Sequence, residues 1–169
     1  ASGPAQEISE LARGSSTWPS LLVDCVLIDK DPEALAAARA HIEAIDLSDR
    51  QSLRVQYVCE DVMKPQLDAI ARGGKFDLVF ASGLFDYFSD RVAENRIRAL
   101  AGCARAGGEV LIGNMAPHGS SRWLMEAHLD WLLKYRTYEE IVALGDRAVP
   151  TLTRRVSRTA SDINPFLVL

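Results

Sequence analysis

Short apolar runs alternate along the chain with segments whose apolar residues recur at helical spacing. VDCVLID (23–29) is one such run, and it is typical of a buried strand. In the next segment, Leu35, Ala38 and Ile42 share one face of a helix that we expect Asp31 to cap. The same pattern predicts helices at 4–14, 31–45, 65–72 and 89–104, and strands at 23–29, 54–62, 75–83 and 107–115.

The last third of the chain departs from this alternation. A helical pattern runs over 121–148 and is predicted to break near Thr137, where T-Y-E-E forms a capping box with Glu140. Two strands, 151–158 and 164–169, are predicted next, and their short connection leaves no room for a helical crossover, so one of them runs antiparallel. The sequence therefore predicts an α/β fold in a single domain, with a doubly wound, mostly parallel sheet and a C-terminal antiparallel hairpin.

Composition narrows the class of protein. Of the 169 residues, 48% are hydrophobic and 25% are charged, so a globular core is feasible. The net charge of -4, without a long Lys/Arg run, argues against a nucleic-acid partner. No apolar run reaches the ~20 residues that span a bilayer. Cys25, Cys59 and Cys103 are too far apart in the sequence for a zinc site, so we expect no metal. We expect Cys25 and Cys59 to be buried, reduced thiols, which are typical of a cytoplasmic protein.

Polar residues follow the predicted strands at their carboxyl ends, where ligands bind in an open parallel sheet. These residues are Asp29, Asp61, Ser82–Gly83 and Asn114. An aspartate at the position of Asp29 can accept hydrogen bonds from ribose hydroxyls, and Asp61 can accept one from an exocyclic amine while Val62 packs against the base. The alternative is a solvated acid or helix cap for Asp29 and an ordinary loop acid for Asp61.

The chain opens on a turn of small residues, Ala1, Ser2 and Gly3, followed by a predicted helix with Pro4 in its first turn. Small side chains let the backbone approach a ligand closely, and a helix N-terminus offers free N–H groups to an anion. The turn contains one glycine and lacks both G-x-G-x-x-G and the Walker lysine, so it is not a P-loop.

With these residues in place, the chain resembles class I S-adenosylmethionine-dependent methyltransferases over nearly its whole length. Five motifs match the family in the same order, and the closing strand pair resembles its antiparallel hairpin. They are S-G-P-A-Q-E, V-L-I-D-K-D-P-E-A-L, E-D-V, F-D-L-V-F-A-S-G and G-G-E-V-L-I-G-N. The order is specific for the family and says little about the substrate.

The resemblance implies S-adenosyl-L-methionine as the cofactor and assigns it a contact at each matching position. The implied contacts are Ala1, Ser2 and Gly3 along the methionine part, Asp29 at the ribose with Lys30 beside the adenosine, Asp61 and Val62 at the adenine, and Ala81, Ser82 and Gly83 near the sulfonium. Ala1 and Ala5 stand where the family often has glycine.

The family's first strand, which lies in the middle of its sheet, has no counterpart in this sequence. A central strand cannot be lost without leaving unpaired backbone groups on both neighbours. We therefore expect the chain to be part of a longer polypeptide whose upstream segment supplies this strand. A strand swapped from a partner chain is the alternative, and the sequence leaves the oligomeric state open.

Candidate contacts to the methyl acceptor are Asp86, Tyr87, Asn114 and His118, which follow predicted strand ends. The aromatic residues of RWLMEAHLDWLLKYRT (122–137) have helical spacing, which is typical of a core, with the wall of an apolar pocket as the alternative. The A-S-G-P start and the D-W-x-L-x-Y-R-T stretch resemble bacterial methyltransferases that make fatty-acid methyl ester signals. That resemblance implies a carboxylate acceptor, which needs no general base.

The leading hypothesis is a methyltransferase that acts on a small-molecule or lipid-like acceptor. The sequence marks no single catalytic residue, so a non-catalytic domain that keeps the fold and the cofactor is an alternative. A nicotinamide-dependent oxidoreductase is a third hypothesis, and the single glycine and the antiparallel hairpin disfavour it.

Overall fold

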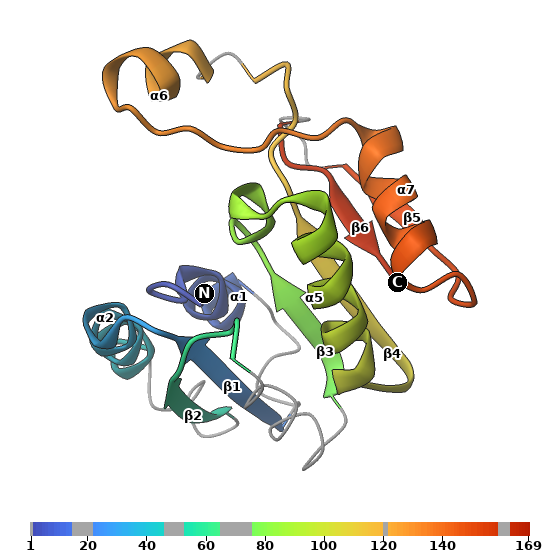
Figure 1. The fold of residues 1–169 in the computed structure, drawn as a ribbon. Coiled ribbons are helices and arrows are strands. Elements are labelled where there is room, and N and C mark those ends of the chain that lie inside the picture. The colour runs from blue at the N-terminus through green and yellow to red at the C-terminus, as the bar shows by residue number, and fades with distance from the viewer. Residues whose placement is uncertain (1, 15–21, 46–52, 65–75, 120–121, 159–162) are drawn as a thin grey trace. The chain divides into compact units, whose positions relative to one another are not determined.

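The computed structural model describes residues 2–14, 22–45, 53–64, 76–119, 122–158 and 163–169 (Figure 1). The chain divides into two units, Ala1–Gln66 and Leu67–Leu169, which we call the first and the second unit. In the described residues, the first unit has a sheet of two strands and the second a sheet of four. The helix predicted at 65–72 lies outside the described residues.

Two parallel strands, β1 (Val23–Asp29) and β2 (Leu53–Cys59), form the sheet of the first unit (Figure 1). They pair in register along their whole length, so their carboxyl ends lie side by side. Two helices, α1 (Gln6–Gly14) and α2 (Pro32–Glu43), belong to the same unit. These elements confirm the strand–helix–strand pattern predicted for this part of the chain.

The α2 helix begins and packs as its sequence predicts. The side chain of Asp31 accepts the N–H of Glu33 at 2.9 Å, which caps the first turn. Leu35, Ala38 and Ile42 are buried, and they pack with residues of β1 and β2. Burial of this apolar face therefore holds α2 against the strands.

The second unit has a mixed sheet with the strand order β3-β4-β6-β5. β3 and β4 are parallel, whereas β6 is antiparallel to both of its neighbours, so the predicted antiparallel hairpin is present. The elements, in chain order, are β3 (Phe76–Ala81), the 3-10 helix η2 (Phe85–Tyr87), α5 (Asp90–Cys103), β4 (Ala104–Gly113), α6 (Arg122–His128), α7 (Tyr138–Ala148), β5 (Arg155–Ser157) and β6 (Phe166–Val168). Parallel and antiparallel strands with helices between them confirm the predicted α/β class.

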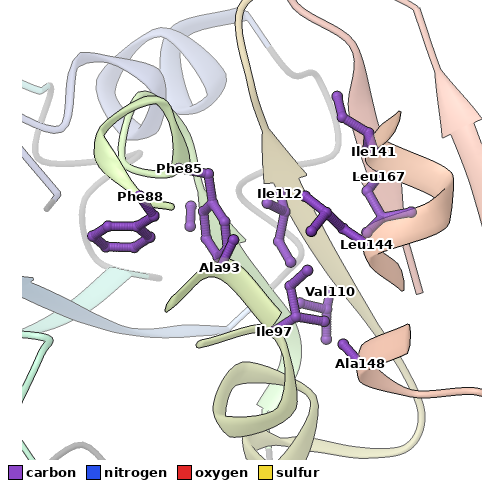
Figure 2. Close-up of a cluster of buried hydrophobic side chains, with 11 residues drawn as sticks. Phe85, Phe88, Ala93, Ile97, Val110, Ile112, Ile141, Leu144, Ala148 and Leu167 are labelled. Carbon is purple, nitrogen blue, oxygen red and sulfur yellow. The ribbon is translucent and has the colours of Figure 1, made fainter. Parts of the chain in front are cut away.

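One buried apolar cluster holds the second unit together (Figure 2). In Figure 2, Ile97 of α5 and Leu144 of α7 lie with Val110 and Ile112 of β4 and with Leu167 of β6. Full burial of each such side chain contributes ~1.5–3 kcal/mol. The two helices are therefore fixed on the sheet, and the end of β4 is a rigid place from which to present side chains.

Several strand boundaries differ from the prediction; for example, β5 covers only Arg155–Ser157 of the predicted 151–158. Two of the differences have a local reason. β2 ends at Cys59 and not at residue 62, because the carboxylate of Asp61 accepts the N–H of Met63 at 2.8 Å and turns the chain. β4 begins at Ala104 and not at residue 107, and it passes through Gly107 at φ 78°, a conformation that suits glycine.

The helical region predicted up to residue 148 contains a longer break than expected, between α6 and α7. Asp130 has φ 48°, which interrupts the helix. The backbone N–H groups of Lys134 and Arg136 donate to the carbonyl oxygens of Asp86 and Met115, at 2.7 and 3.0 Å. Hydrogen bonds to distant parts of the chain therefore replace the helical ones in this segment.

Some side-chain expectations are wrong. Cys59 is exposed, whereas Cys25 is half-buried, and burial raises the pKa of the Cys25 thiol. The aromatic residues expected in a core are partly at the surface, because Trp123 and Trp131 are both exposed.

No helix in the described ranges has both the length and the apolar character that a membrane crossing requires.

Candidate cofactor site

The carboxylate of Asp29 ties the end of β1 to the opening turn of the first unit. Asp29 is 8% exposed. Its Oδ2 accepts the backbone N–H of Gly3 at 2.9 Å, and its Oδ1 accepts the N–H of Asp31 at 3.0 Å. The N–H of Ser2 donates to the carbonyl of Ile28 at 2.8 Å. Residues 26 positions apart in sequence, Gly3 and Asp29, therefore meet at one strand end.

The backbone of the opening turn needs small residues. Gly3 has φ 54° and Ala5 has φ 49°, both in the left-handed region. A non-glycine residue there is strained by roughly 1–2 kcal/mol. Ala5 adopts this strained conformation while its methyl group is buried against residues of β1 and α2.

Asp61 lies just beyond the neighbouring strand end. β1 and β2 finish beside each other, and the N–H of Glu60 donates to the carbonyl of Asp29 at 2.9 Å. Asp61 follows at once, half-buried, with its Oδ1 bound to the N–H of Met63. The structure thus brings Gly3, Asp29 and the Asp61 turn to the same edge of the first unit.

The other residues predicted to contact the adenosine or the methionine part have the following positions. Lys30 is exposed and its carbonyl accepts the Cys59 thiol at 3.8 Å, whereas Val62 is half-buried. Ser2 is half-buried in the opening turn. Ala1 lies outside the described residues.

In the second unit, the residues predicted near the sulfonium follow β3. Ala81 ends the strand and is buried, Ser82 is half-buried, and Gly83 is exposed with φ 68°. A side chain at Gly83 would meet no atom within 4 Å, so the left-handed backbone, and not a lack of space, is the reason for glycine here.

Asp86 and Asn114, predicted acceptor contacts from two strand ends, are bonded to each other. They are both 3% exposed. Asp86 Oδ1 accepts Asn114 Nδ2–H at 2.9 Å and the N–H of Met115 at 2.6 Å. Burial raises the pKa of Asp86, and the Met115 hydrogen bond and the positive charge of Arg136 oppose that rise in part. The pair therefore has a structural role, and its predicted contact with the acceptor stays a prediction.

Tyr87 and His118, the other two predicted acceptor contacts, are at the surface. Tyr87 is 56% exposed, and its hydroxyl accepts the indole N–H of Trp131 at 2.9 Å. His118 is exposed beside Tyr138, with ring centroids 6.3 Å apart. Among the described residues, no group of His, Cys, Asp and Glu is arranged to hold a metal ion.

Sequence reasoning missed the burial of Arg136. Arg136 is 2% exposed and bonds to Asn114 Oδ1 at 2.5 Å. The available signal was the arginine that directly precedes the capping box at Thr137, within a segment expected to be helical. An arginine on a predicted helix is ordinarily solvated, so the pattern alone did not indicate its burial.

A comparison with protein families decides the class. Residues 2–112 match the family model described as a methyltransferase domain, which covers more than half of the chain. The chain belongs to this family of methyltransferase domains. The cofactor of the family is S-adenosylmethionine, as the motif resemblance implied, and this favours the methyltransferase hypothesis over the nicotinamide one. No curated protein matches the chain significantly.

Solved structures with the fold of this methyltransferase domain include several methyltransferases, and another is described as a pericyclic reaction enzyme, with a TM-score of 0.65 at 18% identity, over 99% of this chain and 40% of its own. An O-methyltransferase family protein from Burkholderia thailandensis aligns with a TM-score of 0.70 at 21% identity, over 99% of this chain and 48% of its own. A riboflavin-derivative dimethyltransferase from Streptomyces davawensis aligns with a TM-score of 0.65 at 16% identity, over 99% and 47%. Human N-acetylserotonin methyltransferase, solved with SAM, aligns with a TM-score of 0.63 at 14% identity, over 99% and 44%. The chain thus spans about half the length of these proteins and shares their fold.

Proposed function

We propose that this chain is the cofactor-binding part of an S-adenosylmethionine-dependent methyltransferase that modifies a small-molecule or lipid-like acceptor. The observation that carries the proposal is the hydrogen bond between Gly3 and Asp29 at the end of β1, in a chain of this family. The family match runs from residue 2 to 112, past the boundary between the two units, which supports assigning both units to one cofactor-binding domain. The free cysteines support a cytoplasmic location.

The polar groups at the ends of β1 and β2 suit an adenosine. The Asp29 carboxylate accepts the backbone N–H groups of Gly3 and Asp31 at the strand end, and we propose that a ribose hydroxyl of the cofactor donates to it there. Asp61 uses one oxygen in its turn and keeps the other for the exocyclic amine of adenine. We assign Lys30 to the adenosine, Val62 to the adenine face, and the opening turn to the methionine part.

The residues after β3, in the second unit, are further proposed cofactor contacts. We assign Ala81, Ser82 and Gly83 to the cofactor near its sulfonium. When bound, the cofactor supplies an electrophilic methyl group for in-line displacement. The chain itself has then to hold the acceptor in line and exclude water, which accounts for most of the rate of such a transfer.

We propose an apolar acceptor with a carboxylate as the methylated group. Tyr87 and Trp131 offer exposed aromatic rings for an apolar body. A carboxylate is ionised at neutral pH and is already a nucleophile, so the proposal requires no general base. Asp86, Asn114 and His118 remain candidate acceptor contacts.

Isothermal titration with S-adenosylhomocysteine tests the cofactor assignment. Asp29→Ala is expected to weaken binding by ~1–3 kcal/mol, because a charge-assisted acceptor of the ribose is lost. Asp24→Ala is the matched control, since Asp24 lies on the same strand with an exposed side chain 3.9 Å from Arg54. No binding by the wild type at millimolar concentration would reject the proposed function, and equal affinity of the two variants would remove Asp29 from the site.

The acceptor class is tested with S-adenosylmethionine labelled on its methyl group. Label that enters medium-chain fatty acids as base-labile methyl ester supports the carboxylate acceptor. Label that enters only phenolic hydroxyl compounds contradicts the carboxylate and keeps the methyltransferase assignment.

Cofactor binding without methyl transfer is the second candidate function. The observation that favours it is the mutual hydrogen bond of Asp86 and Asn114, which occupies two of the candidate acceptor contacts. It is supported if the chain binds S-adenosylhomocysteine and transfers no label to either acceptor class.

A further inference from the structure

The segment 131–136, between α6 and α7, is hydrogen-bonded to each of the residues 85–88, in the connection that follows β3. The indole of Trp131 donates to the Tyr87 hydroxyl, and the backbone N–H of Lys134 donates to the Asp86 carbonyl at 2.7 Å. The Arg136 guanidinium donates to the two flanking carbonyls, those of Phe85 at 2.9 Å and Phe88 at 2.6 Å. The conformation of residues 85–88 is thus set by a segment more than 40 positions away.

Arg136 is the buried member of this set, and its donors are fully used. Besides the two carbonyls, Nη1 donates to Asn114 Oδ1, and Nη2 and Nε donate to Asp90 Oδ1 at 3.0 and 3.3 Å. A guanidinium has five N–H donors in a rigid plane, and five acceptor contacts surround this one. Burial of an arginine is costly unless its charge and donors are satisfied, so the partners and the arginine depend on one another.

We propose that Arg136 is a positioning residue for methyl transfer, which holds residues 85–88, in the connection after β3, in a single conformation. This inference rests on the proposed function, because it takes Ser82 and Gly83 as cofactor contacts and Asp86 as an acceptor contact. Arg136 also bonds to Asn114 at the end of β4, so it joins the carboxyl ends of β3 and β4. A lysine cannot replace it, since one ammonium group cannot reach the Phe85 and Phe88 carbonyls and Asp90 together.

Hydrogen exchange of the full chain tests the positioning role without reference to any ligand. In Arg136→Lys, the amides of Tyr87 and Phe88, which donate to the carbonyls of Leu84 and Phe85, are expected to exchange about tenfold faster or more, while amides of β4 keep their rates. Arg98→Lys is the matched control, because Arg98 also donates to a carbonyl, that of Ala148 at 3.1 Å, from the middle of α5. Its turn amides are expected to be unchanged.

Titration with S-adenosylhomocysteine supplies the functional arm of the test. Arg136→Lys is expected to raise the dissociation constant roughly fivefold or more, since the flexible connection must be ordered on binding, and Arg98→Lys is expected to leave it unchanged. Unchanged exchange of the turn in Arg136→Lys overturns the proposal, as does faster exchange spread equally over β4. Faster turn exchange with wild-type affinity reduces Arg136 to a structural residue and also overturns it.

A milder variant covers the case in which Arg136→Lys does not fold. Asp90→Asn keeps an oxygen acceptor for Arg136 and removes only the charge, at a side chain that is 51% exposed. About twofold to threefold faster exchange, confined to the turn amides, supports the proposal. Wild-type exchange in Asp90→Asn overturns it. If the wild type itself fails to bind S-adenosylhomocysteine, the proposed function fails, and the exchange data still decide whether Arg136 orders the turn.

Discussion

Asp29 and Asp86 are buried aspartates whose surroundings act on the carboxylate in opposite directions. Burial acts to raise the pKa of Asp29, but the hydrogen bonds it accepts, among them those from Asp31 and Gly3, lower it below the ordinary value of 3.8. Burial raises the pKa of Asp86 above 3.8, and its hydrogen bond from Met115 offsets this only in part. A carboxylate that stays charged suits ribose binding, whereas Asp86 is closer to its neutral form.

This contrast predicts a pH dependence for Asp86→Asn. The amide oxygen of asparagine can accept the same bonds from Asn114 and Met115 without a buried charge. Because the folded-state pKa of Asp86 is raised, the wild type gains stability as pH falls through that pKa, and the gain is complete below the unfolded value of 3.8. The unfolding free energy of Asp86→Asn minus that of the wild type should therefore be larger at pH 7 than at pH 4.

Urea unfolding of both proteins at the two pH values measures this difference. The pKa of Asp90 is lowered chiefly by its hydrogen bond to Arg136, and Asp90 is present in both proteins, so its contribution is common to both sides of the comparison. A difference in unfolding free energy that does not change with pH would show that the Asp86 carboxyl titrates as it does in the unfolded chain.

At the scale of elements, two reciprocal hydrogen bonds determine where α7 begins. Thr137 accepts the N–H of Glu140 at 3.3 Å, and the Glu140 side chain accepts the N–H of Thr137 at 2.8 Å. This reciprocal capping box confirms the sequence prediction. Thr137 directly follows Arg136, which donates to the carbonyls of Phe85 and Phe88. The cap of α7 and the turn after β3 are therefore joined through two adjacent residues.

Thr137→Ala is expected to lower the free energy of unfolding by ~1 kcal/mol, through loss of the cap. Chemical denaturation measures it, with Thr153→Ala, an exposed threonine before β5, as the control. Equal stability of the two variants would mean that packing of α7 on the sheet alone sets where the helix begins.

At the scale of the whole molecule, each of the two units holds residues that we assign to the cofactor. The first unit holds Asp29 and Asp61 at the ends of β1 and β2, and the second holds Ser82 and Gly83 after β3. The family match spans both. If the two units form one domain, as we propose, cofactor binding should stabilise both of them.

Ligand-linked stabilisation tests this assignment. At a concentration of S-adenosylhomocysteine 100 times its dissociation constant, the wild type is expected to gain about 2.7 kcal/mol of unfolding free energy. Amide exchange should then slow in both α2 and α5, one helix from each unit. Protection confined to α2 would show that the ligand stabilises the first unit alone.

The sequence by itself determined the class of fold, the order of its elements and the position of the cofactor motifs. These features depend on local patterns: the apolar run of 23–29, the cap at Asp31 and the capping box at Thr137 each specify structure within a few residues. Asp29 was predicted as a site residue in the same way, because it ends a strand of apolar residues.

Only the tertiary structure decided which polar groups are buried and what they bind. Residues 129–137 have a helical pattern, yet their backbone bonds to Asp86 and Met115, so the helix is interrupted. The burial of Arg136 likewise depends on carbonyls and carboxylates supplied by distant segments. Such contacts leave no periodic signal in the sequence, because the partners are brought together only when β3, β4 and α5 have packed.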